Sequence, residues 1–238
     1  MRALEWDGYP NCRDLGGLPL ASFPGTTTVV GRVARGPRRE RLTTAGWAQA
    51  HGWGVRSIID LRSSSETGVR PGDPVVDDAA RTTATVMLRP TEDQTDPEFR
   101  RRCLPILDSP EYWAHNWELQ PGLVRNALEA IATAEPGVLV HCSAGRDRTG
   151  MITTLLLGNA GVSAEAIVDD YSASVLAMAG TGASPHDRMA SWTTAQVEAW
   201  LVGAAPIVHA VAGRASEVLA QLGVGARTRA RLRQLLLP

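Results

Sequence analysis

Short apolar runs separated by turn residues fill the first part of the chain, and longer helical patterns fill the last part. Residues 55–61 and 138–140 are rich in β-branched and aliphatic side chains, which is typical of buried strands. Residues 85–88 form a third such run, and residues 29–30 and 33–34 are shorter strand candidates. The carboxyl end of the strand at 55–61 is expected to place Asp60 and Arg62 at one edge of a sheet.

Apolar residues at helical spacing dominate the second half of the chain. Residues 42–51 predict an earlier helix with a hydroxyl N-cap, and residues 123–134 predict an amphipathic helix that ends at a Pro-Gly pair. The further predicted helices span residues 151–159, 164–178, 195–211, 215–222 and 227–237. We therefore expect an α/β protein with a mainly parallel sheet flanked by helices and a helical C-terminal region at 195–238.

Residues 91–121 differ from both patterns, because they mix an acidic cluster, an arginine triplet and the aromatic residues Tyr112, Trp113 and Trp117. We expect a partly helical insertion here that could cover a site. Trp113 and Trp117 are four residues apart and would share one face of a helix. They either anchor the insertion to the core or take part in the site. The whole chain, 1–238, is interpreted as a single domain.

Composition narrows the class of protein. The 238 residues are 44% hydrophobic, and 24 basic side chains nearly balance 25 acidic ones. This balance argues against a disordered chain and against a strongly basic nucleic-acid-binding surface. We find no long apolar run that suggests a membrane span, and Glu5 and Asp7 interrupt any signal-peptide core. A cytoplasmic location is expected, although export without a cleaved signal stays open.

The cysteines and histidines have no spacing typical of a metal site. Cys12, Cys103 and Cys142 are far apart, and the same holds for the histidines outside the segment described below: His51, His115, His186 and His209. Cys103 is interpreted as a packed thiol, with a protective disulfide to Cys142 as the alternative. Every basic residue is Arg, so any cationic site must use guanidinium groups.

The strongest chemical signal lies between a predicted buried strand and a predicted helix. Residues 141–150 read His-Cys-Ser-Ala-Gly-Arg-Asp-Arg-Thr-Gly. A loop that enters a helix N-terminus turns backbone N–H groups inward, and the helix dipole favours negative charge there. The small residues Ser143, Ala144 and Gly145 permit the tight curvature. This segment therefore predicts a cradle for a tetrahedral dianion such as phosphate.

Four side chains of the segment have expected roles in the chemistry. Arg148 can hold two phosphate oxygens with its planar guanidinium. Inward amides, the helix N-terminus and the guanidinium groups favour the thiolate of Cys142, which is the expected nucleophile. The Thr149 hydroxyl can donate to the sulfur when it leaves, and His141 can bond to backbone and fix the loop. The alternative for Cys142 is a buried thiol that precedes a helix.

The pattern Cys-x5-Arg-Thr, preceded by His141, resembles the phosphate-binding loop of the protein tyrosine phosphatase superfamily. Other segments are similar in order and spacing to its bacterial and fungal tyrosine phosphatase branch, which includes secreted mycobacterial-type enzymes with dual protein and phosphoinositide activity. These segments are residues 11–17, 31–35, 42–43, 59–63 with Glu66, and 169–171. Two positions depart from the branch: Arg146 replaces the usual Lys, and Cys12 replaces an aromatic residue.

The resemblance implies two-step hydrolysis of phosphate monoesters, above all of protein phosphotyrosine. Cys142 attacks phosphorus and water then hydrolyses the phosphocysteine, with no metal or cofactor because the loop stabilises the charge. No Trp-Pro-Asp tripeptide is present to supply the acid. The branch suggests Asp147, and Asp60 is the second candidate. Asp147 could instead orient Arg146 through a salt bridge, and Asp60 with Arg62 could buttress the loop.

Residues 143–148 are the expected phosphate-binding set. Arg13 and Asp14 are expected to form a structural pair near the active face, and Asp14 could also help to hold the loop. The expected partner is a phosphorylated protein or a phosphoinositide, and the oligomeric state is left open.

Three other functions stay open at this point. A phosphoinositide or inositol-phosphate phosphatase would use the additional positive charge of Arg146. A catalytically silent module would use the same cradle to recognise phosphorylated partners. A thiol-based redox or sulfur-transfer enzyme could also use a cysteine at a helix start, but it leaves Arg148 unexplained.

Overall fold

The computed structural model describes residues 2–81, 84–181 and 188–238. Within them, five strands form one sheet in the order β1-β2-β5-β3-β4. β1 is antiparallel to β2, and the other neighbouring pairs are parallel. The strands are β1 (Arg13–Asp14), β2 (Val33–Gly36), β3 (Ser57–Asp60), β4 (Thr85–Leu88) and β5 (Val138–His141). The mainly parallel sheet predicted from the sequence is confirmed, and β5 occupies its centre.

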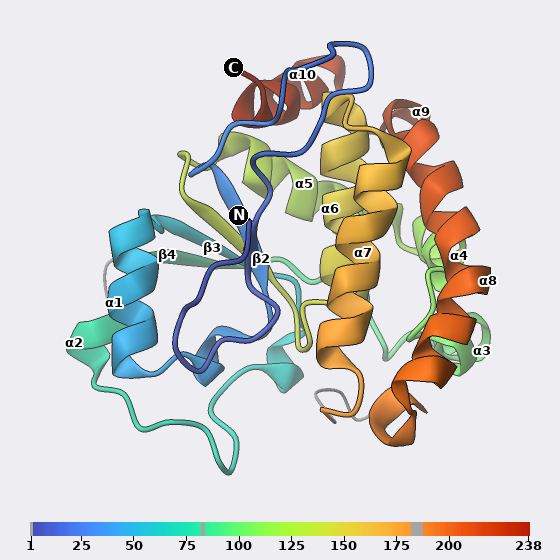
Figure 1. The fold of residues 1–238 in the computed structure, drawn as a ribbon. Coiled ribbons are helices and arrows are strands. Elements are labelled where there is room, and N and C mark those ends of the chain that lie inside the picture. The colour runs from blue at the N-terminus through green and yellow to red at the C-terminus, as the bar shows by residue number, and fades with distance from the viewer. Residues whose placement is uncertain (1, 82–83, 182–187) are drawn as a thin grey trace.

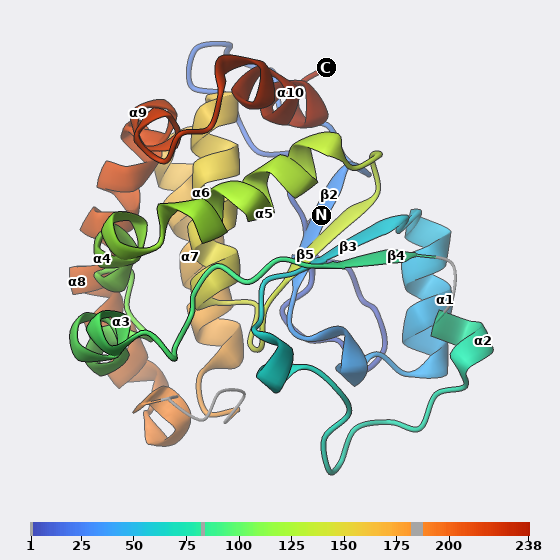
Figure 2. The same cartoon turned by 180° about the vertical axis from the view of Figure 1, so that it is seen from behind.

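Helices cover both faces of the sheet (Figures 1 and 2). α1 (Thr44–Trp53) and α2 (Asp78–Arg81) lie on one side, whereas α5 (Pro121–Thr133) and α6 (Asp147–Ala160) lie on the other. Side chains of the strands alternate between the two cores, since Ile58 packs on the α1 side and Ile59 on the α5 and α6 side. β5 is buried on both faces, which explains its continuous apolar sequence.

Most predicted helices are confirmed within a few residues. α1 begins at the expected hydroxyl cap, because the Thr43 side chain accepts from the Gly46 amide. The C-terminal helices are α7 (Ala164–Met178), α8 (Thr194–Gly213), α9 (Ala215–Gln221) and α10 (Ala226–Leu236). Short 3-10 helices also occur, namely η1 (Arg39–Arg41), η2 (Ser64–Glu66), η3 (Leu104–Ile106) and η4 (Arg188–Ser191). The short α2 was not predicted, because four residues give too little periodicity.

The strand predicted at residues 29–30 is wrong. Val30 is exposed and lies in a turn that continues into Gly31, whose φ is +78°. The Gly31 amide donates to the Asp14 carboxylate, and the Val29 amide donates to the Leu236 carbonyl. The backbone groups of this segment therefore have partners outside the sheet.

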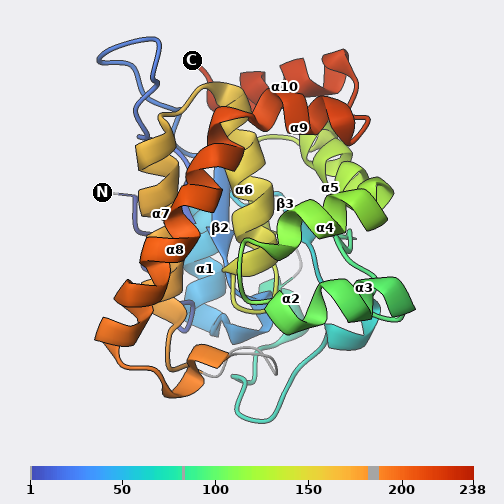
Figure 3. The ribbon, with the colours of Figure 1, turned by 90° about the vertical axis from the view of Figure 1, so that its right-hand side faces the viewer.

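The insertion at 91–121 is partly helical, as predicted. It contains α3 (Pro97–Arg102), η3 and α4 (Tyr112–Leu119); in Figure 3, α3 and α4 lie at the right of the view and α8 at the left. Trp113 is buried against Tyr171 of α7 with ring centroids 5.7 Å apart, and the Trp117 indole N–H lies 3.2 Å from the Met151 sulfur. These contacts show that both tryptophans anchor the insertion to the helical core.

α8 departs from the expectation that no segment is suited to span a membrane. By length and composition its 20 residues are apolar enough to do so, with a mean hydropathy of 1.3, and 22% of that window is buried. The same properties occur in helices of proteins without membrane spans. α8 packs along α7 and α6 in the structure, so the absence of a span stays a prediction.

Candidate active site

The segment at 141–150 forms the expected strand, loop and helix. His141 ends β5 and Asp147 begins α6, so residues 142–146 form the connecting loop. The loop curves tightly at Gly145, where φ is +69° and an added Cβ would lie 2.4 Å from the Gly36 backbone. Only glycine fits this position without movement of β2. The loop places Cys142, only 2% exposed, at the carboxyl end of the central strand.

The carbonyl groups of the loop are bound by the surrounding protein. The Ser143 carbonyl accepts from the Arg38 amide, and the Ala144 carbonyl accepts from the Asn11 side chain at 3.1 Å. The Gly145 carbonyl accepts from Arg35 at 2.7 Å. In a planar trans peptide, the N–H points opposite to the preceding C=O. The amides of residues 144–146 therefore face the interior of the loop, as an anion cradle requires.

Asn11 and Arg35 were not recognised from the sequence as loop supports. Arg35 is 1% exposed and also binds Asp170 of α7, which in turn contacts Arg13 at 3.0 Å and Arg2 at 2.9 Å. Burial would raise the pKa of Asp170, but these three guanidinium groups hold it well below its usual range. Asn11, Arg13, Arg35 and Asp170 lie in the segments that resemble the phosphatase branch. That resemblance was the signal that could have marked them as supports of the loop.

Arg148 lies in the first turn of α6 and is already oriented by acidic side chains. Its two terminal nitrogens donate to both carboxylate oxygens of Glu66, at 2.6 and 2.7 Å. Burial raises the pKa of Glu66, but the hydrogen bonds from Arg148 outweigh that effect and lower it to about 2. The Glu66 carboxylate also accepts from the Ser63 amide and hydroxyl. This clamp holds the guanidinium against the loop before any anion arrives.

Asp147 and Glu92 line the same small cavity as Arg148. Asp147 accepts from Arg146 at 3.0 Å, so the salt bridge considered in the sequence analysis is present. Burial raises the pKa of Asp147 against the opposing influence of Arg146. Glu92 is 2% exposed and lies 3.6 Å from Arg148, and burial raises its pKa as well. Both carboxyls can therefore retain a proton at higher pH than a free carboxyl, and Glu92 was missed because no motif marks it.

Asp60 lies beneath the loop in a network of ion pairs. It is fully buried and contacts Arg62 at 2.7 Å, Arg39 at 2.8 Å and His141 at 3.7 Å. Burial would raise the pKa of Asp60, but Arg62 and His141 lower it to about 2. A carboxyl that stays ionised is a poor proton donor, so these contacts favour the buttressing role over the acid role.

His141 is neutral and holds the backbone of the loop. It is fully buried, which lowers its pKa to about 4 despite the nearby Asp60 carboxylate. Its Nδ1 lies 3.1 Å from the Cys142 carbonyl oxygen. Thr149 is also fully buried, and within the described residues its hydroxyl has no hydrogen-bond partner. That hydroxyl is free to donate elsewhere.

Asp14 does not have the role expected of it. Its carboxylate accepts from the amides of Gly16 and Gly31 and from the Trp53 indole, and it shows no contact with the loop in the described residues. Arg13 pairs with Asp170 instead of with Asp14. Asp14 therefore shapes the N-terminal segment, because short polar side chains readily cap nearby backbone turns.

The cysteines outside the loop are packed thiols. Cys103 is free and fully buried in the main core, and burial raises its pKa to about 11. Cys12 is free and packs in the second core, where burial raises its pKa further. His186 lies outside the described residues.

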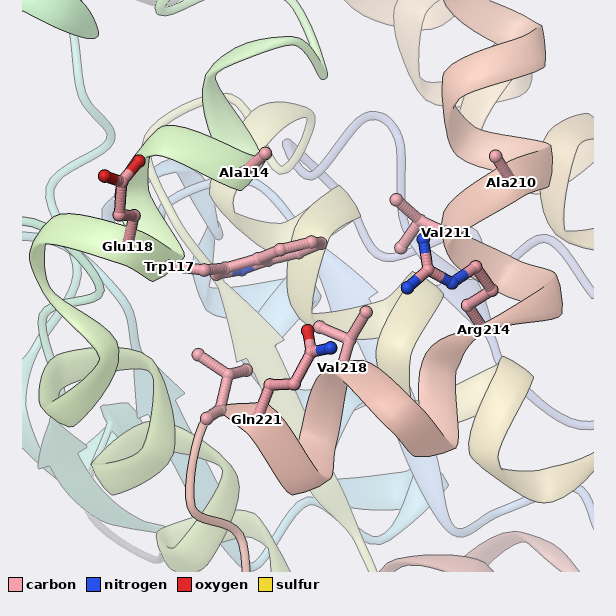
Figure 4. A pocket seen from close by; sticks show the side chains of 9 residues that line it. Ala114, Trp117, Glu118, Ala210, Val211, Arg214, Val218 and Gln221 are labelled. Carbon is pink, nitrogen blue, oxygen red and sulfur yellow. The ribbon is translucent and has the colours of Figure 1, made fainter.

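A larger cavity of about 490 Å³ lies elsewhere, between α4, α8 and α9 (Figure 4). The Trp117 ring projects into it from α4, and Arg214 and Gln221 face it from the C-terminal helices. Among the residues that the structure describes, its lining holds neither a cysteine nor a histidine. The smaller cavity is lined by Asp147 and by the oriented Arg148, next to the loop that carries Cys142, so we take it as the candidate active site.

The fold and site together define a class of protein: a phosphatase whose central strand leads into a Cys-x5-Arg phosphate loop at a helix N-terminus. The sequence matches the profile described as the tyrosine phosphatase family over residues 4–238. The chain therefore belongs to this family, and it is an enzyme that hydrolyses phosphate monoesters.

Two relatives illustrate the similarity. The chain is 30% identical over 195 residues to the triple specificity protein phosphatase PtpB of Mycobacterium tuberculosis, which covers 72% of this chain and 68% of that protein. It is 32% identical over 149 residues to a tyrosine-protein phosphatase of Nostoc commune, which covers 62% of this chain and 50% of that protein. The resemblance inferred from the sequence is confirmed.

Proposed function

We propose that this phosphatase works through a phosphocysteine on Cys142 and that its substrates are proteins phosphorylated on tyrosine. The observation that carries the proposal is the outward bonding of the loop carbonyls, which leaves the amides of residues 144–146 facing the interior. These amides and Arg148 supply several hydrogen-bond donors for the three equatorial oxygens of the phosphoryl group during its transfer.

In the first step, the Cys142 thiolate attacks phosphorus in line as the bond to the leaving oxygen breaks. Asp147 donates its proton to that oxygen, so that a neutral phenol departs. In the second step, water attacks the phosphocysteine and gives a proton to the Asp147 carboxylate. The Thr149 hydroxyl stabilises the sulfur anion that leaves, and the products are inorganic phosphate and the original thiolate.

Two features of the site support these roles. Burial raises the pKa of Asp147, so this carboxyl retains a proton to higher pH than a free carboxyl does, which favours it as the proton donor. The Glu66 clamp holds Arg148 in place before substrate arrives, so little entropy is lost when it binds phosphate.

The contacts of Arg146 favour a protein substrate over a phosphoinositide. The phosphoinositide alternative relies on the positive charge of this residue, but Arg146 is 1% exposed and its guanidinium already donates to Asp147. The Nostoc relative is named a tyrosine-protein phosphatase, which agrees with the protein substrate.

The experiment compares steady-state turnover of a phosphotyrosine peptide and a soluble phosphoinositide in reducing buffer, for wild type and Cys142→Ser. We expect the peptide to be the better substrate and Cys142→Ser to lose at least about 1,000-fold in kcat. Faster turnover of the phosphoinositide would replace the proposed substrate. Binding of phosphate without turnover would instead indicate a silent binding module.

A further inference from the structure

A second cavity, of about 510 Å³, lies close to the phosphate loop and is rich in arginine. Arg38, Arg41 and Arg70 line it, and among the described residues Asp73 is the one acidic residue in its lining. The remaining lining residues are small or uncharged: Gly8, Thr43, Pro71, Gly72, Pro74 and Thr181. With three guanidinium groups and one carboxylate, the described part of the lining has an excess of positive charge.

The pairing of these groups leaves two arginines available. Arg38 is bound by both Asp73 oxygens at 2.5 Å, so these two charges cancel. The Arg41 side chain is half-buried and has no hydrogen bond or ion pair in the described ranges. Burial and the neighbouring Arg38 both lower the pKa of Arg41, as they do for Arg70. Both effects indicate positive charge that lacks a matching anion.

The cavity is connected to the active site through the backbone and side chain of Ser143. The Arg38 amide donates to the Ser143 carbonyl at 3.0 Å, and the Arg70 guanidinium lies 3.5 Å from the Ser143 hydroxyl. Arg70 also donates to the Glu66 carbonyl at 3.3 Å. Arg70 therefore contacts the phosphate loop and lines the same cavity as Arg41, so one substrate can reach both places.

We propose that this cavity is a second anion subsite, in which Arg41 and Arg70 bind the carboxylate of an acidic residue close to the phosphotyrosine of a protein substrate. This inference rests on the proposed function, and it adds a sequence preference to it. A carboxylate on a flexible side chain fits a recess of this kind, and guanidinium groups bind carboxylates with two parallel hydrogen bonds.

The surroundings favour a peptide over an anionic membrane as the source of this anion. Asp7 is exposed next to Gly8, and Asp77 and Asp78 are exposed just beyond Pro74. Their charges would repel a bilayer of anionic lipids that approached these segments. A single acidic side chain of a peptide presents much less negative charge to them than a bilayer does.

The test uses phosphotyrosine peptides that carry one aspartate at successive positions on either side of the phosphotyrosine, each paired with its alanine counterpart. For wild type at low ionic strength, we expect one position to raise kcat/KM about tenfold over alanine. In Arg41→Gln this ratio should fall to near one, while turnover of a small aryl phosphate stays unchanged. Arg227→Gln, an exposed arginine on α10, removes the same charge and should keep the wild-type ratio.

Each outcome decides between clear alternatives. An aspartate preference that survives in Arg41→Gln, or one that is absent in wild type at every position, overturns the subsite. If Arg41→Gln instead reduces turnover of phosphoinositide vesicles and leaves the peptides unaffected, the cavity serves a lipid headgroup. Failure of the proposed function is distinct, because wild type would then not hydrolyse the aryl phosphate through Cys142.

Discussion

Two carboxyl groups at the candidate active site are candidates for the general acid. Asp147 and Glu92 line the same cavity as Arg148, and burial raises the pKa of both. Glu92 faces charged or titratable groups on several elements, namely Arg148, Asp147, Glu66, Tyr112 and Cys103. Of the two, only Asp147 belongs to the expected phosphate-binding set at residues 143–148, as the first residue of α6. We therefore assign the proton transfer to Asp147 and regard Glu92 as a group that orients Arg148.

This assignment predicts different pH profiles for two matched substitutions. Asp147→Asn should lose about 100-fold or more in kcat and should lose the decline of activity at high pH, because the proton donor is gone. The loss should be larger for phenyl phosphate than for a nitrophenyl phosphate, whose leaving group needs less protonation. Glu92→Gln should keep the shape of the profile. If Glu92→Gln flattens the high-pH limb and Asp147→Asn does not, Glu92 is the acid.

At the scale of elements, the phosphate loop is held by helix α7 and strands β1 and β2 through one buried ion cluster. Asp170 of α7 binds Arg13 and Arg35, and Arg35 reaches the Gly145 carbonyl. The Asp170 carboxylate thus balances the positive charges of Arg13 and Arg35, which are buried. Its removal would leave those guanidinium groups buried without a counter-ion.

We expect Asp170→Asn to lower the free energy of unfolding by about 3 to 5 kcal/mol, as measured by urea denaturation. Asp169→Asn changes the neighbouring, exposed residue of the same helix and should alter stability by less than about 0.5 kcal/mol. Equal stability of the two variants would show that the cluster does not support the fold.

The elements were more predictable from the sequence than the contacts between them. Strands at 55–61 and 138–140 and the helix at 164–178 follow from local apolar patterns, which the chain shows directly. The support of Gly145 by Arg35 joins residues 110 positions apart, and no local pattern encodes such a pair. Asp14 was misjudged for a different reason: its carboxylate binds the amides of Gly16 and Gly31 in nearby turns, and these contacts compete with any role at the loop. Cys142 and Arg148 were predictable because their spacing is itself local.

At the scale of the whole molecule, the buried charges of the site make stability depend on pH. The pKa of Glu66 and that of Asp60 are both about 2, and the pKa of His141 is about 4. Each of these three pKa values lies below the pKa of the same group in the unfolded chain. Between the two values, the unfolded chain therefore binds more protons than the folded protein. Stability then rises with pH in that range and falls on acidification.

We predict that the free energy of unfolding is highest near neutral pH and declines as the pH drops from about 6.5 toward 2. His141 is responsible for the first part of the decline, and Glu66 and Asp60 for the part below about 4.5. Glu66 alone accounts for up to about 3 kcal/mol. In Glu66→Gln the decline below pH 4.5 should be shallower than in wild type. A stability that stays flat on acidification would contradict the assigned ionisation of these groups.

The central claim is that a covalent phosphocysteine forms on Cys142, and one measurement tests it directly. Wild-type protein is mixed with a phosphotyrosine peptide, quenched in acid within the first turnover and analysed by peptide mass spectrometry. We predict that the peptide containing Cys142 gains the mass of one phosphoryl group, that the modification decays as phosphate is released, and that Cys142→Ala shows none. Full turnover in Cys142→Ala, or a phosphoryl group on another residue, would contradict the account.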